Sequence, residues 1–63
     1  MITVYTGPAV VVRIWSRDAG PADVPDVVEI AETNAGSLFL RTDLEGLLCP
    51  AGTWGRISWP LTR

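Results

Sequence analysis

The chain of 63 residues contains no histidine and no lysine, and Cys49 is its only cysteine. A single cysteine excludes an internal disulfide, and without histidine no plausible set of zinc ligands remains. The thiol and the serine hydroxyls also lack the histidine that usually activates such nucleophiles. These absences argue against an enzyme, and we expect neither a cofactor nor a bound metal.

Long apolar runs and a basic leader are missing as well. The apolar runs are as short as Ala9–Val12 and Val27–Val28, whereas a membrane-spanning helix needs about 20 residues. The first residues, Met1-Ile2-Thr3-Val4, show none of the basic, apolar and small-residue regions of a secretion signal. We therefore expect a cytoplasmic protein, in which one reduced thiol is ordinary.

The length predicts one small β-rich domain, residues 1–63, with a limited interior. A chain of about 60 residues buries only about 60% of the surface that its unfolded form exposes. Because neither a disulfide nor zinc can supplement the core, self-association is the remaining common source of buried surface. The sequence therefore predicts a homo-oligomer.

The charge is low and unevenly distributed. A net charge of −2 argues against a dedicated duplex-DNA binder, since such proteins neutralise phosphates with many cations. Residues 18–32 hold five carboxylates, and all five arginines lie outside this segment. An acidic segment of this kind either meets a basic partner or is simply exposed to solvent, and we favour the second interpretation.

The composition also bears on the origin of the chain. Ala, Gly, Pro and Arg, which have GC-rich codons, number 22, whereas Lys, Asn, Ile, Phe and Tyr number 7. This bias indicates a high-GC bacterium or one of its phages.

Short β-favouring runs between turn residues predict an all-β fold. Strands are expected at 2–6, 9–17 and 53–59, with a tight turn at Gly7-Pro8. The prolines and aspartates of 18–25 predict the longest loop, and residues 43–48 predict a connecting turn. Together with a hairpin within 26–42, these elements predict a small five-stranded barrel or a bent antiparallel sheet.

Residues 26–42 decide the fold class. Alternating apolar residues on either side of Asn34-Ala35-Gly36 predict a β-hairpin. The alternative is an α+β fold with a helix at about 26–35, because Asp26 and Glu29 have the spacing of a capping box and Gly36 suits a helix C-cap. We favour the hairpin, since β-branched residues are frequent here and are poor helix formers.

The alternation of side chains along a strand places tryptophan and arginine together. Arg13, Trp15 and Arg17 have one parity in their strand, and Trp54 and Arg56 share a parity in the last strand. Trp and Arg are enriched at the energetic centres of protein interfaces. These five residues are therefore the predicted partner-binding residues, and a bulge at Gly55 would change the pattern by inverting the parity after it.

The resulting hypothesis is a non-enzymatic module that binds another protein or assembles with itself, through these faces or through an unblocked edge strand. One alternative is a small barrel that binds single-stranded nucleic acid, with bases stacked on its aromatic rings. Another is a structural subunit of a larger assembly. Cys49 is expected to be a small apolar residue of the interior, and nearby carboxylates such as Asp43 and Glu45 match no specific metal or acid–base motif.

Overall fold

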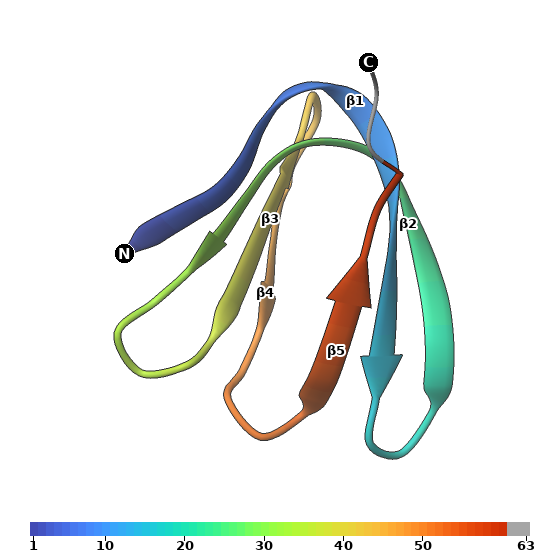
Figure 1. Cartoon of the computed structure of the whole chain (residues 1–63), viewed down its shortest axis with the longest axis vertical. Helices are drawn as coiled ribbons and strands as arrows, with labels where there is room; N and C mark the ends of the chain where they lie inside the picture. Colours follow the sequence, from blue (N-terminus) through green and yellow to red (C-terminus); the bar gives the residue numbers. More distant parts are fainter. Residues whose placement is uncertain (61–63) are drawn as a thin grey trace.

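The computed structural model describes residues 1–60, which form five antiparallel strands in one open sheet (Figure 1). The strands are β1 (Ile2–Ser16), β2 (Gly20–Glu32), β3 (Leu38–Thr42), β4 (Gly46–Cys49) and β5 (Trp54–Ser58). Their order across the sheet is β4-β3-β2-β1-β5. The all-β prediction is confirmed. The alternative helix at 26–35 is wrong, and no part of residues 1–60 offers a helix able to cross a membrane.

The two long strands, β1 and β2, run side by side and bend together, so that the sheet curves around its own interior (Figure 1). The tight turn predicted at Gly7-Pro8 does not occur. Residues 7–9 lie within β1 between the pairs Thr6↔Glu29 and Val10↔Val27, where β1 advances by four residues and β2 by two. The turn residues therefore produce an irregularity that bends a continuous strand, rather than a chain reversal.

The prediction of a long loop at 18–25 is also wrong. Residues 17–19 make a short turn, and β2 already begins at Gly20. Pro21 and Pro25 are tolerated because this half of β2 pairs with β1 alone, since β3 joins only from Val27 onward. On the side of a strand that faces no neighbouring strand, the missing N–H of a proline costs no hydrogen bond of the sheet. Asp26, with φ 61°, forms part of a second bulge beside Pro25.

The predicted hairpin between β2 and β3 is confirmed. Thr33 closes its loop: the Thr33 N–H donates to the Ser37 carbonyl, and the Ser37 N–H donates to the Thr33 hydroxyl, at 2.9 and 3.0 Å. Gly36 has φ 86°, a backbone conformation that glycine adopts without a steric penalty. The loop spans residues 33–37 and is thus longer than the three residues that the sequence suggested.

The prediction of a connecting turn at 43–48 is correct for residues 43–45 and wrong for the residues that follow. The turn covers 43–45, and its Thr42 hydroxyl accepts hydrogen bonds from the N–H groups of Leu44 and Glu45. The next four residues form β4, an edge strand paired with β3. The sequence analysis missed this strand because it is only four residues long, begins at Gly46 and is followed directly by Pro50.

The core lies on the concave side of the bent sheet. Its buried members come from the first three strands: Val10, Val12, Ile14, Val27, Ile30, Leu38 and Leu40. Half-buried residues of the two edge strands and their neighbours, including Leu47, Cys49, Trp54 and Ile57, pack against this cluster. The edge strands thus close the core from its two sides without hydrogen-bonding to each other.

Candidate functional site

A bulge in β5 sorts the tryptophan and arginine side chains between the two faces of the sheet. Trp15 is opposite Arg56, but the next residue of β1, Ser16, is opposite Trp54, so that Gly55 is an extra residue in β5. The bulge that would invert the parity of β5 is therefore present at this glycine. Because residues opposite one another share a face, Arg56 lies with Trp15 on the outer face, and Trp54 lies on the core side.

Three of the five predicted binding residues meet on the outer face, and we call Arg13, Trp15 and Arg56 the Trp15 surface. The Arg56 guanidinium carbon lies 4.7 Å from the centroid of the Trp15 ring, a cation–π distance. Trp15 is half-buried, whereas both arginines are exposed. Three neighbouring positions of β1 and β5 thus present an aromatic ring between two cations.

A shallow hollow of about 250 Å³ adjoins the Trp15 surface. Its lining includes Arg13 and Asp23, together with Ser58, Trp59 and Pro60 after the β5 bulge. Arg13 is therefore common to the hollow and to the Trp15 surface. Its lining thus combines the charged Arg13 and Asp23 with the apolar Val11, Trp59 and Pro60.

The other two predicted residues lie elsewhere. Trp54 packs against the hydrophobic core, and its Nε1 is buried without a hydrogen-bond partner among residues 1–60. Arg17 lies in the β1–β2 turn, where its backbone N–H donates to the Thr53 carbonyl at 3.1 Å. The expectation that Trp54 and Arg56 share one face is corrected by the Gly55 bulge.

An ion pair orients Arg13. Its Nε donates to Oδ1 of Asp23 at 2.9 Å, and a terminal nitrogen donates to Oδ2 at 3.4 Å. The hydrogen bond from Arg13 lowers the pKa of the Asp23 carboxyl below its ordinary value. A lowered carboxyl pKa stabilises the fold above the ordinary aspartate pKa, and this contribution is lost as the pH falls through the lower folded-state value.

We expect a titration of Asp23, followed by NMR of its carboxyl carbon, to show a midpoint below the ordinary aspartate value. Arg13→Gln should raise this midpoint, because the hydrogen bond and the cation are removed. Arg17→Gln is the matched control, since Arg17 lies in the turn and makes no such contact. An Asp23 midpoint that is the same in the natural chain and in Arg13→Gln would contradict the ion pair. Both side chains are exposed, so the effect on unfolding should be small.

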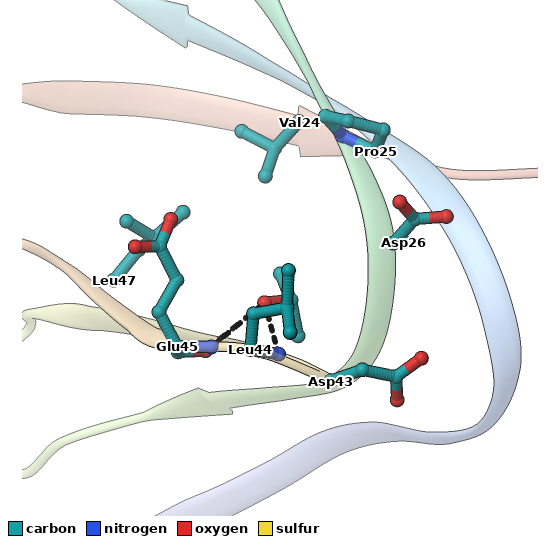
Figure 2. Close-up of a pocket in the computed structure, with 8 residues that line it drawn as sticks. Val24, Pro25, Asp26, Asp43, Leu44, Glu45 and Leu47 are labelled. Atoms are coloured by element: carbon teal, nitrogen blue, oxygen red, sulfur yellow. Dashed lines mark hydrogen bonds between the residues drawn. The ribbon is translucent and has the colours of Figure 1, made fainter.

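A groove of about 510 Å³ opens between β2 and the β3–β4 turn (Figure 2). Val24 and Leu47 point into this space in Figure 2, and both also pack against the core. Three carboxylates line it, from Asp26, Asp43 and Glu45, with no arginine among the lining residues. The sequence analysis missed this groove because it brings the Pro25-Asp26 bulge close to a turn about 20 residues away, and no local pattern signals that approach.

The thiol and the carboxylates are the groups within residues 1–60 that could carry chemistry. Cys49 is half-buried, and its burial raises the pKa of the thiol, which favours the protonated and less nucleophilic form. Within the same residues, no three carboxylates or thiols lie close enough together to hold a metal ion. The recognisable features are surfaces: the Trp15 surface, the groove and the two sheet edges.

Comparison of the chain with protein-family models, with curated proteins and with solved structures finds no match in any of the three.

Proposed function

We propose that this chain is a non-enzymatic binding module that recognises an acidic and apolar segment of another protein through the Trp15 surface. The observation that carries the proposal is the guanidinium of Arg56 stacked 4.7 Å from the Trp15 ring on the exposed side of the sheet. Trp and Arg are both enriched at the energetic centre of protein interfaces, and the Trp ring buries a large rigid area there.

The two arginines of the surface have different roles. Arg13 is already held by Asp23, so that it frames the hollow beside the surface. Arg56 makes no salt bridge within residues 1–60, and its donors are available to a carboxylate from outside. Stacking on Trp15 restricts the Arg56 side chain before it binds, which lowers the entropy lost on binding. A partner carboxylate on Arg56 and an apolar side chain in the hollow match the chemistry of this surface.

The nucleic-acid alternative has less support from the aromatic residues. A binding site for single strands needs several rings on which successive bases stack. Tyr5, Trp54 and Trp59 instead pack against the core, and Tyr5 and Trp59 contact each other with ring centroids 5.8 Å apart. Within residues 1–60, the Trp15 surface holds a single half-buried ring. That ring and a net charge of −2 suit a protein segment better than a phosphate backbone.

The proposal is tested with a phage-displayed library of random 12-residue peptides, selected on the immobilised chain. We expect enriched peptides to combine Asp or Glu with an apolar residue. Arg56→Gln and Trp15→Ala should each weaken binding of the enriched peptides by about 2 kcal/mol, roughly 30-fold in Kd. Arg41→Gln is the matched control, because Arg41 is also exposed but is paired with Glu29 at 2.8 Å on another part of the sheet.

Two outcomes would contradict the proposal. One is the absence of any enrichment over an unrelated immobilised protein. The other is equal binding of the enriched peptides by the natural chain and Arg56→Gln. Tight, salt-sensitive binding of a labelled dT20 strand that Trp15→Ala abolishes would instead favour the nucleic-acid alternative.

A further inference from the structure

The two edges of the sheet differ in how well they are protected against pairing with another strand. β5 contains the Gly55 bulge and the charged Arg56, both of which hinder strand addition. β4 is Gly-Leu-Leu-Cys, without charge or proline, and it pairs with β3 in an unbroken register. Among the described residues, β4 is therefore the edge without a bulge, a charge or a proline, although its four residues limit any pairing to a short segment.

The hydrogen-bond pattern shows which groups β4 presents outward. The Thr42 N–H donates to the Glu45 carbonyl at 2.8 Å, which marks Thr42 and Glu45 as a hydrogen-bonded pair. Such pairs alternate along an antiparallel ladder. Leu47 and Cys49 consequently bond to β3, whereas the N–H and C=O groups of Gly46 and Leu48 point to the free edge.

We infer that two copies of this chain associate by antiparallel pairing of their β4 strands about a two-fold axis. In the register that fits best, Gly46 of each copy is opposite Leu48 of the other, and the two Leu47 residues face each other. This register pairs all the outward N–H and C=O groups of both edges, in two hydrogen-bonded pairs. It also keeps Pro50, which has no N–H, outside the paired residues.

The side chains fit the same register. Leu48 is 61% exposed on the outer face, next to Phe39 of β3. Gly46 leaves the outer face free for the Phe39 ring, since a Cβ at Gly46 would lie 2.9 Å from a ring carbon. Leu48 of the second copy, opposite Gly46, would therefore meet Phe39. The pairing covers exposed apolar surface and places Glu45 opposite Cys49, so that no like charges meet.

The inference is tested by engineered disulfides in a Cys49→Ser background. Facing residues of a non-hydrogen-bonded pair have Cα atoms about 4.5 Å apart, which lies within the disulfide range. Leu47→Cys should therefore form a covalent dimer rapidly in an oxidising glutathione buffer. Leu44→Cys is the control for random collision, because Leu44 is 95% exposed but lies in the turn. Leu48→Cys reports the alternative register, in which the two Leu48 residues face each other.

The proposal predicts that Leu47→Cys crosslinks at least tenfold faster than the other two variants. Faster crosslinking of Leu48→Cys would overturn the register, and equal rates for all three would overturn pairing through β4.

Light scattering gives a second readout on chains that retain Leu47. The natural chain should dimerise with rising concentration, and Leu48→Pro, which removes an outward N–H but no bond to β3, should be monomeric. A natural chain that stays monomeric at about millimolar concentration, where even weak interfaces assemble, would overturn the proposal. Peptide binding at the Trp15 surface is measured separately and does not depend on these results.

Discussion

Trp54→Ala is expected to lower the free energy of unfolding by about 3 kcal/mol, measured by urea denaturation and far-UV circular dichroism at one fixed protein concentration. Trp54 packs against the hydrophobic core from β5, and its loss removes the largest side chain that this edge strand contributes. Small domains of this size rarely have more than about 3–5 kcal/mol of stability. The variant should therefore keep no more than about 2 kcal/mol of stability.

Trp54→Phe is the informative control for that prediction. The indole Nε1 of Trp54 is buried without a hydrogen-bond partner among residues 1–60, so that phenylalanine removes an unsatisfied donor while keeping much of the apolar volume. We expect a loss below about 1.5 kcal/mol. Trp15→Ala on the outer face should be milder than Trp54→Ala, because Trp15 is not part of the core. The reverse order of the two alanine variants would mean that the faces of β1 and β5 are assigned wrongly.

Ile30→Ala is expected to have a still larger effect, a loss of about 4 kcal/mol, because Ile30 is fully buried in the middle of the core. It belongs to β2, the central strand, and is opposite Tyr5 of β1 and Leu40 of β3. A cavity there loosens three strands at once. Since the loss is comparable with the whole stability expected of the domain, the variant should show the circular dichroism of an unfolded chain at 25 °C.

Ile30→Val separates the volume effect from other causes, because it removes one methylene and should cost only about 1 kcal/mol. The solvent-facing substitution Val11→Ala, in the neighbouring strand, should be nearly neutral, since Val11 is 49% exposed. A cooperative folded state for Ile30→Ala, with a loss below about 1.5 kcal/mol, would contradict the position of Ile30 at the centre of the core.

Local pattern predicted the parts of the fold that depend on local chemistry. The β-branched residues of 26–33 and the positive φ available at Gly36 favour a hairpin whatever surrounds them, and the structure has that hairpin. The predictions at Gly7-Pro8 and 18–25 failed for one shared reason. Glycine and proline end a strand only when the neighbouring strand needs their N–H or their regular geometry, and that need depends on pairing across the sheet. In β1 and β2 they fall at bulges or on an unpaired side.

The same limit applies to the candidate site. Parity alone placed Trp15 with Arg13 correctly, because β1 is regular from Val12 to Trp15. In β5, the face on which each side chain lies depends on whether Gly55 is an ordinary strand residue or the extra residue of a bulge. Only the pairing with β1 shows that it is inserted, which moves Trp54 to the core and leaves Arg56 outside. A single glycine thus decides whether a tryptophan stabilises the fold or is available for recognition.

The order of the strands has a consequence for how strongly the chain holds a repetitive target. The Trp15 surface is formed by β1 and β5, which stand at the other end of the strand order from β4. Two copies joined through β4 would therefore form a sheet of ten strands, and each copy would carry a Trp15 surface outside the paired strands. A target that displays its acidic segment more than once would be held by both, and the second attachment would be intramolecular. Avidity of this kind raises the apparent affinity by about 10²–10⁴ without any new contact, provided that the spacing of the target fits.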